Sequence, residues 1–139
     1  MEKEIIKIEA LIHAEITLVW DCYTQPSHIT EWNFASDDWH CPLAENDLRV
    51  GGKYHVRMEA KDGSFGFDLE AIYKSMDLGK GFVYMMSDER MVTVSMTREG
   101  NNTHIIIEFE AENMNSVELQ RAGWQAILNN FKKHAETNG

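Results

Sequence analysis

The stretch NSVELQRAGWQAILNNFKKHAE, residues 115–136, decides the fold, because it has the residue spacing of one long amphipathic helix. Asn115 is the candidate N-cap, with Glu118 three positions on as in a capping box, and cationic side chains fill the last turn, where the helix dipole favours them. Such a helix needs a sheet to cover its apolar face. Four apolar residues recur at the i, i+3, i+4, i+7 spacing of that face: Trp124, Ile127, Leu128 and Phe131.

The preceding residues supply a sheet. Glycine or polar turn residues separate the segments, Asp62-Gly63 is typical of a tight hairpin, and the Gly51-Gly52 pair suits a bend or bulge. Two short helices, 16–24 and 26–32, follow the first strand, the second beginning at Pro26. These segments alternate apolar and polar residues with the strand period of two: 3–13, 54–60, 65–73, 82–86, 91–98 and 103–111.

This order of elements predicts an α+β helix-grip fold. Hairpin connections give a curved antiparallel sheet, which must wrap around the C-terminal helix for both apolar surfaces to be buried. At 139 residues the chain fits a single domain, 1–139, and its 43% hydrophobic and 26% charged residues are those of an ordinary globular protein. We find no internal repeat or linker.

Residues 33–47 break the pattern, with Trp39 in the middle of a polar, proline-containing segment. Irregular segments of ~12–15 residues inside a compact domain are usually functional or mobile. We therefore predict that residues 33–46 form a loop that acts as a lid.

Charge and composition limit the classes of partner. The net charge of -10 argues against nucleic acid, because phosphate binding needs clustered cations, and leaves a neutral or cationic partner. No apolar run approaches the ~18 residues that span a membrane, and the N-terminus lacks the apolar core of a signal peptide, so we expect no membrane insertion and a cytoplasmic location. Cys22 and Cys41 form no C-x-x-C pair and are expected to be two buried thiols. A monomer and a homodimer fit equally well.

No local cluster has the spacing of a catalytic or metal site, so we expect no catalytic residue, no cofactor and no metal. If the 33–46 loop folds over a cavity, His28, His40 and Cys41 could converge on a metal or a ligand, although their spacing matches no standard zinc pattern. The remaining acidic and histidine side chains are expected to be exposed and structural: Asp68 and Glu70, Glu108 and Glu110, and His55, His104 and His134.

Eight methionines and fourteen aromatic residues are the most informative part of the composition, because methionine suits surfaces that adapt to varied apolar shapes. From the strands, Tyr54, Met58, Phe67, Leu69 and Tyr73 are expected to face the helix residues Trp124, Ile127, Leu128 and Phe131, with Trp32 and Trp39 at the open end. By packing alone, these side chains could equally fill a solid core or line a cavity.

Several motifs resemble a known family over almost the whole chain. They are Val19-Trp20, QPSHITEW at 25–32, DLRVGGKY at 47–54, Asp62-Gly63, Asn102-Thr103 and Gly123-Trp124. On these residues the chain is similar to the START-like (SRPBCC) superfamily, which shares the fold of the Bet v 1-like proteins. Within it, the chain resembles the family similar to the activator of the 90 kDa heat-shock-protein ATPase, homologue 1. Many members carry a Trp-x-x-Pro tract after the second helix, where this chain has NFASDDW at 33–39, so we expect a reshaped cavity rim.

The resemblance implies an apolar cavity between sheet and helix that binds small lipophilic molecules. Our leading hypothesis is accordingly a binding module for a small hydrophobic or aromatic ligand, with a carrier or stress-related role. One alternative is an enzyme of cyclase or hydrolase type, with His40 or Asp68 as general acid or base. Another is a protein-interaction domain, although chaperone activation belongs to longer relatives with an additional domain.

Overall fold

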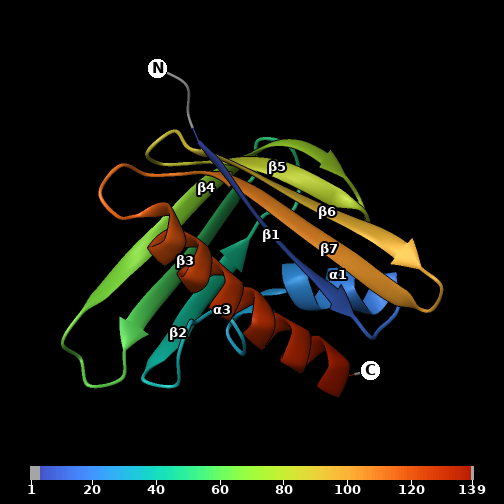
Figure 1. The fold of residues 1–139 in the computed structure, drawn as a ribbon, viewed down its shortest axis with the longest axis horizontal. Coiled ribbons are helices and arrows are strands. Elements are labelled where there is room, and N and C mark those ends of the chain that lie inside the picture. The colour runs from blue at the N-terminus through green and yellow to red at the C-terminus, as the bar shows by residue number, and fades with distance from the viewer. Residues whose placement is uncertain (1–3, 139) are drawn as a thin grey trace.

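The computed structural model describes residues 4–138 and shows the expected helix-grip fold (Figure 1). One seven-stranded antiparallel sheet, in the order β1-β7-β6-β5-β4-β3-β2, curls around a long C-terminal helix. The predicted first strand began at residue 3, which lies outside the described residues, as do the outermost residues of the predicted domain. The elements are β1 (Ile5–Ile12), α1 (Ile16–Thr24), α2 (Pro26–Ile29), β2 (Trp39–Asn46), β3 (Lys53–Ala60), β4 (Gly66–Asp77), β5 (Gly81–Met86), β6 (Met91–Glu99), β7 (Asn102–Glu110) and α3 (Val117–Thr137).

The two helices α1 and α2 join the two edges of the sheet, since β1 and β2 are its outermost strands. Register shifts between His40 and Leu43 in β2, and between Tyr73 and Ser75 in β4, interrupt the pairing. Such bulges bend a strand and increase its twist. The sheet is thereby curved into the half-barrel that receives α3.

The Gly51-Gly52 pair makes the predicted bend between β2 and β3. Gly51 has a φ of 83°, a conformation that side chains disfavour. At Gly52 an added Cβ would lie 2.0 Å from the Asp47 carbonyl oxygen. The chain can therefore turn back tightly enough for the Gly51 amide to donate to the carbonyl oxygen of Tyr73 on β4, at 2.9 Å.

Helix α3 begins one residue later than predicted. Ser116, not Asn115, is the N-cap, and its hydroxyl accepts a hydrogen bond from the Leu119 amide at 3.1 Å. Asparagine and serine both cap helices well, so the sequence does not distinguish Asn115 from Ser116 as the N-cap. The helix packs against β1 and α1 and crosses the concave side of the sheet (Figure 1).

The predicted 33–46 loop is wrong, because residues from Trp39 onward form the edge strand β2, paired with β3. Pro42 suggested irregular structure. It lies at the register shift of an edge strand, one of the few strand positions where the missing N–H is tolerated. The second helix is also shorter than expected, ending at Ile29, and a turn leads on to Trp32.

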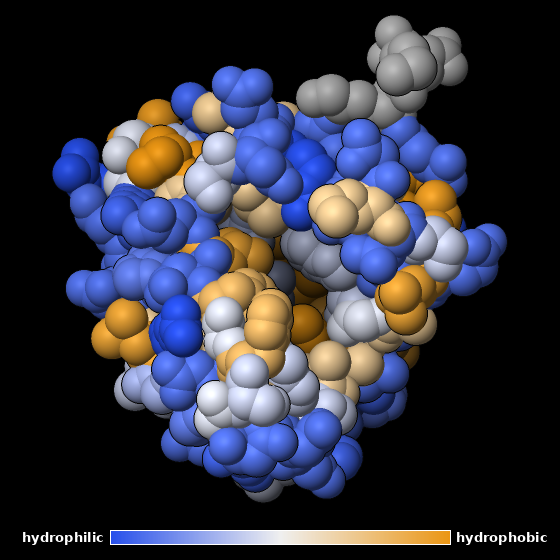
Figure 2. Space-filling model, turned by 90° about the vertical axis from the view of Figure 1, so that its left-hand side faces the viewer, coloured by the Kyte–Doolittle hydropathy of each residue, from blue (hydrophilic) through white to orange (hydrophobic). Residues whose placement is uncertain are grey.

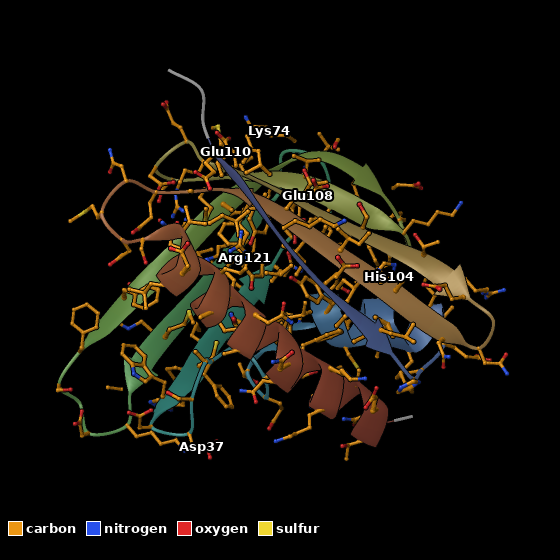
Figure 3. The ribbon with its side chains drawn as sticks, viewed as in Figure 1. Asp37, Lys74, His104, Glu108, Glu110 and Arg121 are labelled. Carbon is orange, nitrogen blue, oxygen red and sulfur yellow. The ribbon has the colours of Figure 1, made fainter. Side chains whose placement is uncertain are left out.

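On β7, His104, Glu108 and Glu110, labelled in Figure 3, alternate with buried Ile105, Ile107 and Phe109, as expected. His104 contacts Glu9 at 2.9 Å and Glu108 is exposed, whereas Glu110 is 8% exposed and accepts a hydrogen bond from the Met91 amide at 2.8 Å. The prediction that Glu110 is a solvated side chain was therefore wrong. Within residues 4–138, no helix is both long and apolar enough to cross a membrane.

Candidate functional site

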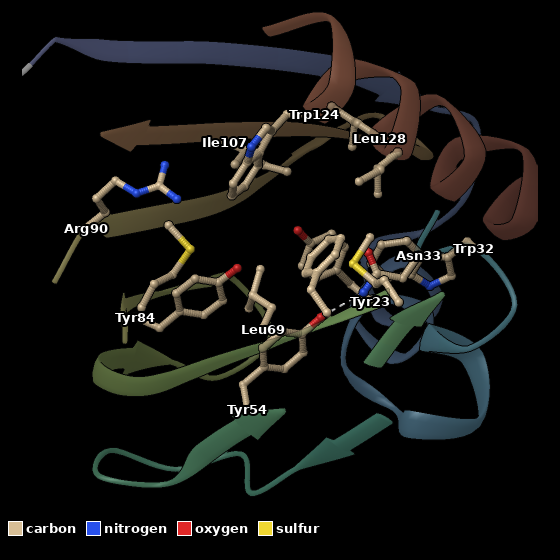
Figure 4. Close-up of a pocket in the computed structure, with 14 residues that line it drawn as sticks. Tyr23, Trp32, Asn33, Tyr54, Leu69, Tyr84, Arg90, Ile107, Trp124 and Leu128 are labelled. Atoms are coloured by element: carbon tan, nitrogen blue, oxygen red, sulfur yellow. Dashed lines mark hydrogen bonds between the residues drawn. The ribbon is translucent and has the colours of Figure 1, made fainter. Parts of the chain in front are cut away.

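A pocket of about 220 Å³ lies between α3 and the part of the sheet formed by β3, β4 and β5. Figure 2 shows a hollow with apolar residues in its depth, and Figure 4 shows the side chains around the pocket. Its lining is Tyr23, Trp32, Asn33, Tyr54, Met58, Phe67, Leu69, Tyr84, Met86, Arg90, Ile107, Trp124, Ile127 and Leu128.

The position of α3 explains why space remains there. The helix packs against β1, at one edge of the sheet, and against α1. Strands β3 and β4 lie towards the other edge, so the curvature of the sheet carries them away from the helix. The pocket is the part of the concave face that α3 does not fill.

The α3 wall is apolar and rigidly supported. The ring of Trp124 stacks on Phe109 of β7, with centroids 3.9 Å apart and planes at 13°. Leu128 is 2% exposed and Ile107 is 3% exposed, so both combine core packing with a surface on the pocket. Across the pocket, Met58 and Met86 offer flexible thioether side chains.

The end of the pocket near α1 is aromatic. Tyr23 stacks on Trp32 with centroids 5.1 Å apart, and Phe131 packs edge-on against both rings from behind. The Trp32 indole donates a hydrogen bond to the Cys22 carbonyl oxygen at 2.8 Å. This bond fixes the ring, so the aromatic end of the pocket is preformed.

Three tyrosine hydroxyls lie at the pocket wall. The Tyr54 hydroxyl accepts a hydrogen bond from Asn33 Nδ2 at 3.4 Å, whereas no described residue hydrogen-bonds the hydroxyl of Tyr23 or Tyr84. Burial, reinforced by neighbouring tyrosines, raises the pKa of all three phenols. They are therefore neutral groups that can donate or accept hydrogen bonds.

Arg90 closes the opposite end and is the cationic residue of the lining (Figure 4). Its Nε donates to Asp88 at 2.7 Å and its Nη1 to the Glu110 carbonyl oxygen at 3.2 Å. The side chain is 20% exposed. These two hydrogen bonds hold the Arg90 side chain in place.

The structure brings together eight of the eleven side chains that the sequence suggested for a binding site: Trp32, Tyr54, Met58, Phe67, Leu69, Trp124, Ile127 and Leu128. Tyr73 and Phe131 do not line the pocket, because their side chains are buried in the core and only 1% and 0% exposed. The Tyr73 hydroxyl donates a hydrogen bond to Asn46 Oδ1 at 2.7 Å. Trp39 packs outside the lining, against Phe65 and Phe67.

Six lining residues were missed: Tyr23, Asn33, Tyr84, Met86, Arg90 and Ile107. Periodicity could have indicated four of them, because Tyr23 lies on the apolar face of α1 and the others lie at inward positions of β5 and β7: Tyr84, Met86 and Ile107. Arg90 lies just after a turn, where no periodicity applies.

His28, His40 and Cys41 do not converge. His28 Nδ1 instead shares a hydrogen bond of 2.9 Å with His134 Nε2 of α3, while His40 lies 3.6 Å from Glu59. His134 is half-buried rather than exposed as expected, and so are His55 and His104. With buried Cys22, the two imidazoles form the candidate metal-binding group of the described residues, their ligand atoms lying within 4.8 Å of one another.

The general acid or base candidates suggested by the sequence lie outside the pocket. Asp68 contacts His55 at 2.9 Å and Arg57 at 3.0 Å on the outer face of β4. His40 belongs to the edge strand β2 and contacts Glu59. Neither side chain contributes to the lining.

A curved antiparallel sheet that grips a C-terminal helix, with an apolar pocket between them, defines a helix-grip domain. The family model described as Activator of Hsp90 ATPase homolog 1-like protein matches residues 13–136. The chain belongs to this family, as the sequence motifs indicated.

Solved structures agree with this assignment. An AHSA1-like protein from Aeromonas hydrophila is 40% identical, with a TM-score of 0.92, and the match covers 98% of this chain and 94% of that protein. A protein from Cytophaga hutchinsonii is 41% identical over 96% and 92% of the two chains, with a TM-score of 0.82. A Nitrosomonas europaea protein, 14% identical over 96% and 95% with a TM-score of 0.81, shares the fold alone. A comparison with curated proteins gave no match.

Proposed function

We propose that the protein binds a small hydrophobic or aromatic molecule in the pocket between α3 and strands β3–β5. The observation that carries this proposal is the pocket itself, an open space of about 220 Å³ bounded mainly by aromatic and aliphatic side chains. Sites for small molecules are typically apolar, with a few polar groups that fix orientation.

The size of the pocket favours a small ligand. Sites for drug-sized molecules are ~300–1,000 Å³, so a space of about 220 Å³ suits a molecule of one or two rings or a short chain. The preformed aromatic end, with Tyr23 stacked on Trp32, offers a flat surface on which a ring can pack.

The lining also favours binding without chemistry. Its three tyrosines have raised pKa values, further from neutral pH than an ordinary phenol. A general acid or base works best with a pKa near the operating pH. These groups are better suited to orienting a ligand by neutral hydrogen bonds.

A ligand screen with a blocked variant tests the proposal. Lipophilic compounds are screened by thermal shift and by tryptophan fluorescence, since Trp32 and Trp124 line the pocket. Leu69→Trp adds bulk to the lining and should abolish the shift caused by any hit. Leu78→Trp adds the same side chain at an exposed turn and should leave the shift intact. The proposal fails if no compound changes either signal, or if both variants respond alike.

A further inference from the structure

We propose that the ligand is an aromatic molecule with an uncharged carbonyl oxygen, which accepts hydrogen bonds from Arg90. This rests on the proposed function and names the class of molecule that the pocket takes. Figure 4 places Arg90 at one end and Trp32 at the other, with Trp124 and Leu69 between them. An elongated ligand therefore meets a hydrogen-bond donor at one end and aromatic surfaces along its body.

Arg90 has donors to spare. A guanidinium carries five N–H groups. Asp88 and the Glu110 carbonyl oxygen each accept one of them from the side chain, and no described residue hydrogen-bonds Nη2. The side chain lines the pocket, so an oxygen atom of a ligand can reach these remaining donors. The hydrogen bonds that fix Arg90 also reduce the entropy it loses when a ligand binds.

The charges around Arg90 favour an uncharged acceptor over a carboxylate. Asp88 contacts the guanidinium at 2.7 Å and already balances its charge. Arg90 also lines an adjoining hollow to which Glu112 contributes. A ligand carboxylate would therefore add an uncompensated negative charge in an apolar pocket, in a chain of net charge -10. A carbonyl oxygen accepts the same hydrogen bonds without that cost.

The two unpartnered phenols are compatible with the same preference. The hydroxyls of Tyr23 and Tyr84 have no hydrogen-bond partner among the described residues, and both are protonated at neutral pH because burial raises their pKa. Both can donate to oxygen atoms elsewhere on a ligand. Each hydroxyl accepts as well as donates, so the phenols are compatible with ligand oxygens, whereas the guanidinium of Arg90, which only donates, selects for them.

Three ligands of the same ring and similar size test the inference: 2-acetylnaphthalene, 2-ethylnaphthalene and 2-naphthoate. Dissociation constants are measured by titration calorimetry or ligand-observed NMR. The ketone should bind the natural protein about tenfold more tightly than the hydrocarbon, the gain expected for a hydrogen bond from a charged donor. It should also bind more tightly than the carboxylate.

Variants assign this preference to Arg90. Arg90→Met keeps much of the side-chain bulk and should abolish the preference for the ketone over the hydrocarbon. Arg98→Met removes the same charge from an exposed position on β6, outside the lining, and should leave the preference unchanged. Asp88→Asn removes the balancing charge and should increase the affinity for 2-naphthoate relative to the ketone.

The outcomes separate this inference from the proposed function. Equal binding of the ketone and the hydrocarbon, tightest binding of the carboxylate, or a ketone preference that persists in Arg90→Met would overturn the inference and leave the pocket as a binding site. If none of the three binds and the wider screen is also negative, the proposed function fails as well. If Arg90→Met does not fold, Asp88→Asn decides, because an unchanged relative affinity for 2-naphthoate contradicts the charge balance.

Discussion

Replacing Trp124 with alanine should both destabilise the protein and change which ligands fit. The indole stacks on Phe109 at 3.9 Å, and such aromatic pairs contribute about 0.5–1.5 kcal/mol beyond the area they bury. Truncating a fully buried aromatic side chain costs ~3–5 kcal/mol. Because Trp124 is only partly buried and one side of it faces the pocket, we expect a loss of about 2–3 kcal/mol in the free energy of unfolding.

The same change removes part of the pocket wall. Trp124 lies between β7 and the pocket, so its loss enlarges the pocket and should shift the preferred ligand towards larger molecules. The free energy of unfolding is measured by urea denaturation, and selectivity by thermal shift with a homologous series of aryl ketones of increasing size. The rank order of affinities, rather than their overall level, carries the result.

Ile6→Ala is the matched control. Ile6 is fully buried on β1 and does not line the pocket, so its truncation should cost a comparable ~2–5 kcal/mol without changing the order of ligand sizes. The informative outcome is a Trp124→Ala variant that is destabilised but keeps the order of ligand sizes of the natural protein, which is the result expected of Ile6→Ala. In that case Trp124 belongs only to the core, and the reasoning about the pocket wall is refuted.

Three further changes test local features of the fold. Ser116→Ala should lower the free energy of unfolding by about 1 kcal/mol and Asn115→Ala by clearly less, since Ser116 caps α3; equal losses in urea denaturation would contradict the cap assignment. Burial and a neighbouring histidine hold the pKa of His134 below its usual value of 6.5, so the unfolded state binds a proton more readily. Its contribution to stability is therefore complete above pH 6.5 and declines as the pH falls below that value. His134→Gln should flatten this decline in urea denaturation. Gly52→Ala should cost ~4 kcal/mol or more by the same measurement, because its Cβ would meet a backbone carbonyl oxygen at 2.0 Å, whereas Gly123→Ala has no atom within 4 Å and should be tolerated.

The fold could be predicted from the sequence because its signals are local. Alternation along each strand, Gly63 in the β3–β4 hairpin and the apolar face of α3 depend on residues a few positions apart. The edge strand β2 was missed for a physical reason. The register shift between His40 and Leu43 interrupts the alternation of its residues, and Pro42 at that shift has the local appearance of a loop.

The candidate site was predicted less completely, because periodicity gives the face of an element but not the depth of a side chain. Phe131 and Trp124 lie on the same face of α3, yet the first is fully buried and the second borders the pocket. Arg90 could not have been found from the sequence. Its place in the lining depends on the turn between β5 and β6 and on two partners, Asp88 and the Glu110 carbonyl oxygen.

Helix α3 has two halves that are held in different ways, and this division accounts for the pocket. Its C-terminal half is anchored by buried side chains, including Phe131 and Ala135, each fully buried. In its N-terminal half the buried side chain is Gln120, which accepts from the Glu112 amide and donates to the carbonyl oxygens of Glu112 and Asn115. Polar contacts with the preceding loop and the stacking of Trp124 on Phe109 thus fix that half without filling the space beneath it. An apolar face that can stand over an open pocket is the result. Under the proposed function, a ligand that fills the pocket would complete the burial that the helix alone leaves unfinished.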